Sequence, residues 1–370
     1  MPDLVLAEES KQYKDLAFDF ATNEIAVHAH RLDHSGQFPL EIYKKAWQIG
    51  LMNVSMPESA GGLGLGISDA CVIAEELGTA CAGAGTAFWA NDLSVARVAL
   101  GSKEQQKRWL EPLSQKFGLA AYCLRFPAES AQVSYRSAGQ DFQLHGNAII
   151  VNGHNADWTT VVAANTADNS ATVFLVPLQK LTLGQAIPAM GLKCADVCQV
   201  QFDGVQLPGD YVLGTVGGAE QLLEKSEARS YSILAAYAVG IIRSSLENAT
   251  RYSKERRTMG VPIGRHQAVA FMLADMAKDA EGARFMVRKA AWFADNGIID
   301  RAAALMAKNF ACRSAMKAAT DAVQVFGGYG YSREYPVEKL MRDAKTLQVY
   351  EQSSTTDNVF IARQLVEASL

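Results

Sequence analysis

The sequence lacks the features that mark nucleic-acid-binding, membrane-spanning and secreted chains. Its 35 Lys and Arg residues are outnumbered by 39 Asp and Glu residues, which gives a net charge of −4. It contains no basic tract of the kind that grips a phosphate backbone, which argues against a nucleic-acid partner. No apolar stretch is long enough to span a bilayer, and the first residues, MPDLVLAEESKQYKD, show no basic segment followed by an apolar one. We therefore expect a cytoplasmic protein.

Cysteine is scarce, and its spacing matches no metal-binding motif. Cys194 and Cys198 lack the spacing of a zinc finger, and no cluster of His and Cys completes a site. We therefore expect reduced cysteines and no metal. The six cysteines are Cys71, Cys81, Cys123, Cys194, Cys198 and Cys312. The glycine-rich stretch PESAGGLGLGISDA contains neither GxGxxG nor GxxxxGK[ST], so its glycines indicate turns and not a phosphate cradle.

Three stretches of different texture predict an α+β chain of three units, since 370 residues are too many for one simple core. Apolar residues recur at helical spacing over 1–118, where Ser102 and Gln105 predict a capping box before KRWLEPL. The stretch 119–220 contains β-branched and alternating runs such as TTVVAAN and CQVQFDGVQLP, which predict a small antiparallel β domain. Long alanine-rich helical patterns fill 221–370 and predict a four-helix bundle.

A single carboxylate, Glu351, lies in the segment TLQVYEQSST near the end of the chain. A carboxylate held in a dry pocket beside an acidic C–H can act as a general base. Removing the α-proton of a thioester also requires hydrogen bonds to the developing enolate oxygen. If the reaction is an oxidation, a hydride acceptor must lie on the opposite face, which requires a cofactor. Composition and spacing alone favour a solvated loop residue.

Longer motifs point to a family. The segments LMNVSMPESAGGLGLGISDACVIAEELG, KERRTMGVPIGRHQAVAFMLADMA and AVQVFGGYGYSREYPVEKLMRDAKTLQVYE occur in this order. With the helix–β–helix order, they make the chain resemble the acyl-CoA dehydrogenases, the medium-chain type most closely, from near residue 10 to near residue 365. The resemblance implies that Glu351 is the α-proton base and that FAD takes the β-hydride. It also implies that the glutamate's backbone N–H and a ribityl hydroxyl of the flavin hold the thioester oxygen.

The resemblance assigns further roles, position by position. Arg229 in EARSYS matches an arginine near the base, so Glu351 and Arg229 are the implied catalytic residues. Substrate contacts are implied for Ser226, Tyr350 and Gln352. Flavin contacts are implied for Tyr122, Leu124, Arg256, Thr258, Gln267, Gln324, Gly327, Gly328, Ser353 and Thr355. Those from Arg256 to Gly328 serve a neighbouring subunit in the family, which implies a homotetramer built as a dimer of dimers.

Other family positions are altered. The first β strand reads roughly Tyr-x-Val/Leu-Thr-Glu-Pro-Gly-Ala-Gly-Ser-Asp in the family and AYCLRFPAESAQ here, and a second motif, Lys-x-Trp-Ile-Thr-Asn-Gly, is NAIIVNG. The replacements are Arg125 for the threonine, Phe126 for the glutamate, Ala128-Glu129-Ser130-Ala131 for Gly-Ala-Gly-Ser, Ile150 for the tryptophan that stacks by the flavin, and Gln352 for the glycine after the base. Contacts to a flavin on this chain's own β domain are thus eroded, whereas those given to a neighbour are kept.

Three interpretations stay open. The chain is a divergent flavin-dependent dehydrogenase, a subunit that completes a partner's flavin site but binds flavin poorly itself, or a flavin-free enzyme that couples α-deprotonation to elimination or isomerisation. The first is favoured because the base is retained. The resemblance implies a thioester of coenzyme A or of an acyl carrier protein as substrate, and an electron-transfer flavoprotein as partner if the chain is redox-active. It also allows a heteromer with a paralogue. Gln352 predicts a short or polar acyl group.

Overall fold

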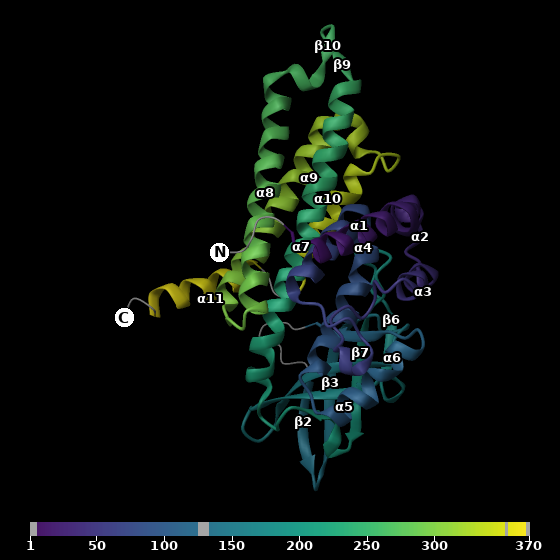
Figure 1. The fold of residues 1–370 in the computed structure, drawn as a ribbon, viewed down its shortest axis with the longest axis vertical. Helices are drawn as coiled ribbons and strands as arrows, with labels where there is room; N and C mark the ends of the chain where they lie inside the picture. Colours follow the sequence, from purple (N-terminus) through teal and green to yellow (C-terminus); the bar gives the residue numbers. More distant parts are fainter. Residues whose placement is uncertain (1–5, 125–132, 352–353, 368–370) are drawn as a thin grey trace.

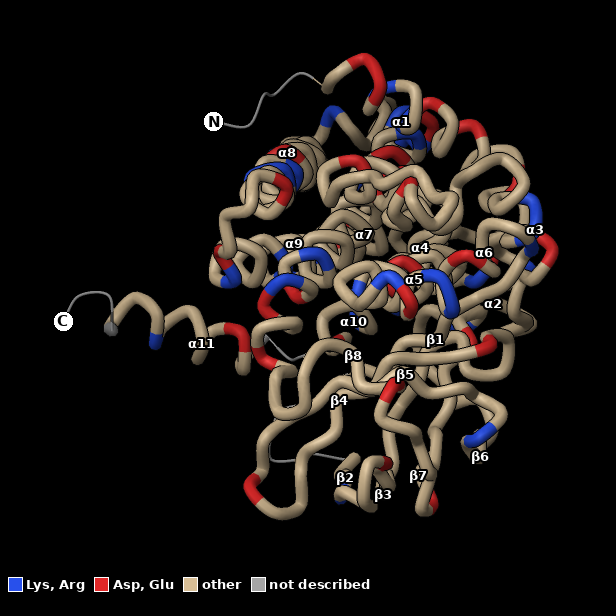
Figure 2. The backbone as a smooth tube through the Cα atoms, turned by 60° about the horizontal axis from the view of Figure 1, so that its bottom comes forward, with Lys and Arg blue, Asp and Glu red and all other residues tan. Residues whose placement is uncertain are grey.

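The computed structural model describes residues 6–124, 133–351 and 354–367. Its sheet forms one end of an elongated molecule, the long C-terminal helices form the other, and the N-terminal helices pack between them (Figure 1). The α+β fold class predicted from the sequence is confirmed. Acidic and basic positions are interspersed along the helices (Figure 2). Within the described ranges, no helix combines the length and the apolar character that crossing a membrane requires.

The N-terminal unit is organised around one long helix, α4 (Ile67–Ala99), most of whose side chains are buried. This helix is interrupted at Cys81, where φ is −167° and ψ is 105°. Helix α5 (Lys103–Trp109) begins at the predicted capping box, in which Ser102 and Gln105 bond to each other's backbone N–H. The other helices of this unit are α1 (Glu8–Phe20), α2 (Ala29–Ser35), α3 (Leu40–Gln48) and α6 (Glu111–Gln115).

The central unit is an eight-stranded sheet. Its strands are β1 (Ala120–Cys123), β2 (Val133–Ala138), β3 (Asp141–Val151), β4 (Trp158–Asn165), β5 (Ala171–Pro177), β6 (Thr182–Ala186), β7 (Val197–Leu207) and β8 (Val212–Leu213). They follow the order β6-β7-β3-β1-β4-β5-β8, and β2 pairs with β3 and β4.

The prediction of an antiparallel domain is wrong at β4, which pairs in parallel with β1 and β2. The N–H of Asp157 donates to the carbonyl of Leu119 at 3.0 Å, so β1 and β4 start from the same edge of the sheet. Alternation within a segment indicates a strand, but it carries no information about the direction of the partner strand.

The two faces of the sheet belong to different cores. Cys123 of β1 and Ile150 of β3 are register partners, and their side chains lie in the sheet's own core. Tyr122 and Val151 are the next register pair, and they face the helices instead. Successive strand residues point to opposite faces, so this helix-facing side is the boundary between the β unit and the helical units.

The C-terminal unit consists of long helices that pack along one another. Its elements are α7 (Ala219–Glu255), β9 (Arg257–Thr258), β10 (Val261–Pro262), α8 (Gln267–Asp295), α9 (Arg301–Phe326), α10 (Val337–Leu347) and α11 (Ser354–Glu367). Helices α7, α8 and α9 pack against one another, and α10 packs on α9. The β9–β10 hairpin forms the tip of the molecule, and α11 extends away from the body (Figures 1 and 2).

The segment between β6 and β7 holds α10 close to the sheet. The N–H of Leu192 donates to Asp343 Oδ1 at 2.7 Å, and Arg342 Nη1 donates to the carbonyl of Met190 at 3.0 Å. Between them, a Cβ atom on Gly191 would stand 2.2 Å from the carbonyl oxygen of Arg342. Only a residue without Cβ permits this approach.

We predict that Gly191→Ala destabilises the protein by about 1–3 kcal/mol, because the added methyl group pushes α10 away from the sheet. Gly282→Ala is the matched control. Gly282 lies within α8, where the nearest atom to an added Cβ would be 3.5 Å away, so alanine should stabilise that helix by roughly 0.5–1 kcal/mol. Urea unfolding measures both changes. If Gly191→Ala were as stable as the parent, the close approach would be contradicted.

Candidate active site

Glu351 lies in the turn that follows α10, directly after Tyr350, and both side chains are buried. Glu351 is 3% exposed and has a φ of 64°. A left-handed conformation costs a residue with a Cβ roughly 1–2 kcal/mol, and strain of this kind clusters at functional sites. The burial of the side chain excludes the interpretation of Glu351 as a solvated loop residue.

An aromatic wall adjoins this turn. The ring centroid of Trp89, on α4, lies 5.7 Å from that of Tyr350 and 5.2 Å from that of Tyr122. Arg97 Nη2 donates to the Tyr122 hydroxyl at 2.8 Å. The buried indole N–H of Trp89 has no hydrogen-bond partner within the described part of the chain. Sequence reasoning missed Trp89, because nothing local distinguishes a site tryptophan from a core tryptophan in a long apolar helix.

Arg229, the second predicted catalytic residue, is held by a carboxylate that the sequence did not point to. Arg229 Nε donates to Asp92 Oδ2 at 2.6 Å and its Nη2 to Oδ1 at 2.9 Å, so the buried pair links α7 to α4. Burial lowers the pKa of Arg229, but Asp92 outweighs it and the pKa is raised. Ser226, one turn earlier in α7, is also buried, and its hydroxyl donates to the carbonyl of Leu223 at 3.3 Å.

The residues expected to contact a neighbour's flavin are exposed. They are Arg256, Thr258, Gln267, Gln324, Gly327 and Gly328, and Thr355 in the first turn of α11 is also exposed. Gly327, which ends α9, has φ 59° and ψ −137°, a conformation that favours glycine. A Cβ on Gly327 or Gly328 would meet nothing within 4 Å. The backbone at this helix end is therefore open to close approach by a group from outside the chain.

The helix-facing side of β1 and β3 offers a flavin mainly apolar side chains. Leu124 follows β1, and its N–H donates to the carbonyl of Ile149 at 2.9 Å. Leu124, Ile149 and Val151 carry no polar side-chain atom, and the Tyr122 hydroxyl is bound by Arg97. The predicted positions Arg125, Phe126, Ala128, Glu129, Gln352 and Ser353 lie outside the described residues. Among the described residues, the exposed set around Arg256, Gln324 and Gly327 offers charged, amide and open backbone groups, whereas this side of β1 and β3 offers mainly apolar ones.

The prediction that Ile150 replaces the tryptophan beside the flavin is wrong by one residue. Ile150 is fully buried in the sheet's own core, whereas Ile149 packs toward the helices. Matching NAIIVNG letter by letter with the family motif gives the same answer, with Ile149 at the tryptophan and Val151 at the threonine. On a strand, a shift of one residue reverses the face that a side chain occupies.

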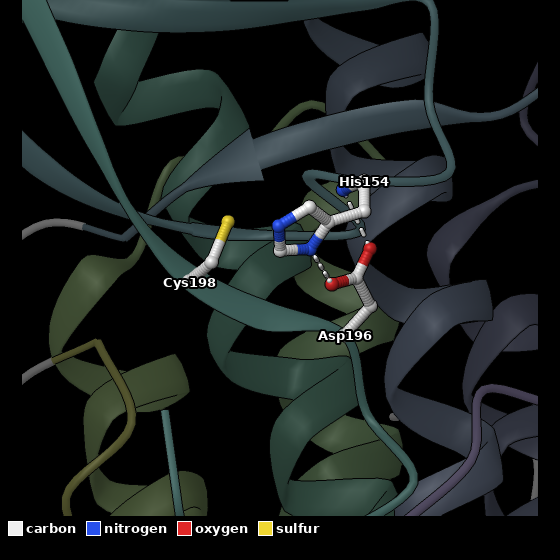
Figure 3. A group of neighbouring side chains, drawn as sticks. All are labelled: His154, Asp196 and Cys198. Atoms are coloured by element: carbon white, nitrogen blue, oxygen red, sulfur yellow. Dashed lines mark hydrogen bonds and ion pairs between the residues drawn. The ribbon is translucent and has the colours of Figure 1, made fainter. Parts of the chain in front are cut away.

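One group of metal-ligating side chains, His154, Asp196 and Cys198, comes together beside the sheet (Figure 3). His154 Nδ1 donates to Asp196 Oδ1 at 2.7 Å, and its Nε2 donates to the carbonyl of Gly184 at 2.9 Å. Asp196 Oδ2 accepts from the N–H of His154 at 2.7 Å and from Asn155 Nδ2 at 2.9 Å. Sequence spacing missed this group, because His154 and Asp196 are 42 positions apart.

The hydrogen bonds make this group a clasp. Both ring nitrogens of His154 and both carboxylate oxygens of Asp196 have hydrogen-bond partners, and Asp196 and Cys198 approach the ring from different sides (Figure 3). Burial raises the pKa of the Cys198 thiol to about 12, which disfavours the thiolate that binds metals. Since both ring nitrogens face acceptors, the clasp requires the doubly protonated imidazolium.

Comparison with known proteins shows which family the chain belongs to. The model for "Acyl-CoA dehydrogenase, N-terminal domain" matches residues 7–116, and that for "Acyl-CoA dehydrogenase, C-terminal domain" matches residues 232–366. "Probable acyl-CoA dehydrogenase YngJ" of Bacillus subtilis (strain 168) is 33% identical over 378 residues, which cover 98% of this chain and 99% of that protein.

Solved structures agree. Butyryl-CoA dehydrogenase from Megasphaera elsdenii superposes with a TM-score of 0.93 at 29% identity, over 98% of this chain and 100% of that one. A structure described for the electron transferring flavoprotein of Acidaminococcus fermentans gives 0.93 at 30% identity, over 98% and 99%. The fold is therefore that of a three-unit acyl-CoA dehydrogenase. The chain belongs to the acyl-CoA dehydrogenase family, which confirms the resemblance seen in its motifs.

We predict that the His154 clasp stabilises the protein most at low pH. The hydrogen bond that His154 donates to Asp196 raises the pKa of His154 in the folded protein, above its usual value of about 6.5. The contribution of the charged ring is therefore complete below about pH 6.5 and is lost as the pH rises through the folded-state pKa. The difference in urea stability between the parent and Asp196→Asn should be larger at about pH 5.5 than at about pH 9. A difference that does not vary with pH would rule out the charged clasp.

Proposed function

We propose that the chain catalyses α,β-dehydrogenation of an acyl thioester, with Glu351 as the base that removes the α-proton. The observation that carries the proposal is the burial of Glu351 in a positive-φ turn at the end of α10, where the family has its base. The aromatic wall of Trp89, Tyr350 and Tyr122 adjoins this turn, and the Glu351 side chain is 3% exposed. Excluding water strengthens every electrostatic interaction of a bound thioester.

In the proposed chemistry, Glu351 both removes the α-proton and stabilises the thioester oxygen. The Glu351 carboxylate takes the α-proton, and the backbone N–H of the same residue donates to the thioester oxygen, where negative charge develops. Arg229, oriented by both carboxylate oxygens of Asp92, adds a fixed positive charge from α7. FAD, when bound, would accept the β-hydride.

The proposed cofactor and assembly follow from the exposed residues. Arg256, Thr258, Gln267, Gln324, Gly327 and Gly328 would hold the flavin of a neighbouring chain, whereas Tyr122, Leu124, Ser353 and Thr355 would serve this chain's own flavin. A guanidinium suits a pyrophosphate, and the open backbone at Gly327 allows close approach. We propose a homotetramer built as a dimer of dimers, with an electron-transfer flavoprotein as electron acceptor.

The proposed substrate is a short or polar acyl group on coenzyme A or an acyl carrier protein. Beside Trp89, a cavity of about 30 Å³ is also lined by Asp92, Ile233 and Tyr237. Among the described residues its lining includes neither Glu351 nor Tyr350, so the expectation of a short or polar acyl group rests on Gln352 beside the base. The buried Trp89 N–H beside Tyr350 adds a polar group to the aromatic wall.

A second candidate function is favoured by the apolar helix-facing side of β1 and β3. Leu124, Ile149 and Val151 offer a flavin ring no side-chain hydrogen bond. The chain would then complete a partner's flavin site, or act without flavin as a thioester lyase or isomerase that uses Glu351.

We predict that Glu351→Gln lowers turnover of a butyryl thioester by about 10²–10⁴-fold, because the amide keeps the shape of the side chain but cannot take a proton. The circular dichroism spectrum and the assembly state should not change. An octanoyl thioester is the size control, and the parent should turn it over more slowly than the butyryl thioester. A loss smaller than about tenfold would remove Glu351 from the role of base.

We also predict substoichiometric FAD in the purified protein. Each hydrogen bond missing from the chain's own flavin site costs about 1 kcal/mol of affinity. The flavin absorbance of the purified protein and a titration with FAD measure the stoichiometry and the affinity. One tightly held FAD per chain would exclude the partner-subunit and flavin-free alternatives. No binding at saturating FAD would exclude the dehydrogenase for this chain without a partner.

A further inference from the structure

Two buried Lys–Asp ion pairs flank the turn that carries Glu351. On the N-terminal side, Lys339 Nζ lies 2.5 Å from Asp343 Oδ2 within α10. On the C-terminal side, Lys308 Nζ of α9 lies 3.3 Å from Asp357 Oδ2 in the first turns of α11. All four side chains are at most 12% exposed. On the C-terminal side, the Lys308–Asp357 pair attaches α11 to α9. On the N-terminal side, Lys339 and Asp343 both belong to α10, and the hydrogen bond from the Leu192 N–H to Asp343 attaches α10 to the rest of the protein.

The pair of Lys308 and Asp357 determines where the chain goes after the turn. Beyond its start, α11 leaves the body (Figures 1 and 2), and Val359 is 47% exposed. Two further contacts between the start of α11 and α9 are a hydrogen bond from Asn309 to Asn358 at 2.8 Å and the stacking of Arg301 on the Phe360 ring at 4.3 Å. The ion pair is the most deeply buried of these contacts.

A buried ion pair is an unusual way to gain stability. The desolvation of both charges offsets most of their attraction, and well-packed apolar residues often stabilise a fold equally well. What such a pair adds is a defined geometry, because neither charge can leave its partner without a large penalty. Burial raises the pKa of Asp357, and Lys308 and Arg301 oppose this rise.

We propose that the Lys308–Asp357 pair is a positioning device that, with the hydrogen bond from the Leu192 N–H to Asp343, holds Glu351 in its positive-φ conformation at the site of proton removal. The catalytic part of this inference rests on the proposed function. A strained residue persists only where its surroundings over-determine it. The Asp343–Leu192 hydrogen bond holds the chain before Glu351, and the Lys308–Asp357 pair holds it after Glu351.

The same charges connect the turn to α7. Lys308 Nζ lies over the Tyr231 ring at 5.3 Å, and Arg301 pairs with Glu227 at 2.7 Å. Tyr231 and Glu227 are on either side of Arg229 in α7. Arg301 and Lys308 of α9 therefore contact both the start of α11, after Glu351, and the α7 segment that carries Ser226 and Arg229.

The test compares Asp357→Asn with Glu76→Gln. Glu76 of α4 pairs with Arg243 of α7 at 2.6 Å and is 2% exposed, so it offers a buried ion pair on elements that do not carry Glu351. Asp357→Asn should lower kcat for a butyryl thioester by roughly 10- to 100-fold with little change in KM. Glu76→Gln should lower stability without this loss of kcat. Equal effects of the two variants on kcat would overturn the positioning role.

A second measurement does not depend on Glu351 being a base. Amide hydrogen exchange of peptides that contain Glu351, in the full-length protein without substrate, should be faster in Asp357→Asn and unchanged in Glu76→Gln. Unchanged exchange in Asp357→Asn would overturn the inference. Faster exchange, found together with full activity of Glu351→Gln, would uphold the positioning of the turn and refute the proposed function instead.

A double variant separates charge from packing. Lys308→Met combined with Asp357→Leu removes both charges and keeps an apolar contact, so stability should recover while kcat stays low. Recovery of kcat as well would show that packing alone positions the turn, and would overturn the role of the charges.

Discussion

The polar side chains of α4 bind the three units of this protein to one another. Asn91 Oδ1 accepts the N–H of Ala120 at 2.9 Å, and the Ser94 hydroxyl donates to the carbonyl of Ala121 at 2.5 Å. Asp92, the residue after Asn91, pairs with Arg229 of α7. A buried backbone group that loses its partner costs about 1–3 kcal/mol. The sheet and the C-terminal helices are therefore held in one orientation by adjacent residues of one helix.

Side chains of α4 also position the candidate active site. Trp89 is on the same helix and packs against Tyr350, so the turn of Glu351 is positioned against the element that also orients β1 and α7. Arg97, two turns later, holds the Tyr122 hydroxyl. The site is assembled where three units meet, which is a common place for a ligand pocket. Strain at Glu351 is tolerated there because rigid elements surround it.

The chain presents two unlike surfaces to the cofactor that its family uses. The surface at the end of α9 has glycines with open backbone, whereas the surface along β1 and β3 has the aliphatic side chains of Leu124, Ile149 and Val151 beside the Arg97-bound Tyr122. In a proposed dimer of dimers these surfaces would meet different flavins. The difference between the two surfaces comes from individual side chains and not from the backbone. The backbone superposes on a butyryl-CoA dehydrogenase with a TM-score of 0.93.

The sequence by itself determined what depends on neighbours along the chain. The capping box of Ser102, the helix end at Gly327 and the change from helical to alternating patterns are local, because caps and periodicity act over a few residues. Motifs of 20 or more residues identified the family and led to the prediction that Glu351 is the base. Only the tertiary structure decided the parallel pairing of β4, the faces of Ile149 and Ile150, and the partners of Arg229, His154 and Asp357. A pattern of apolar residues indicates that one face of an element is buried, but it does not indicate which other element covers that face. Arg229 and Asp92 are 137 positions apart, and only packing brings them together.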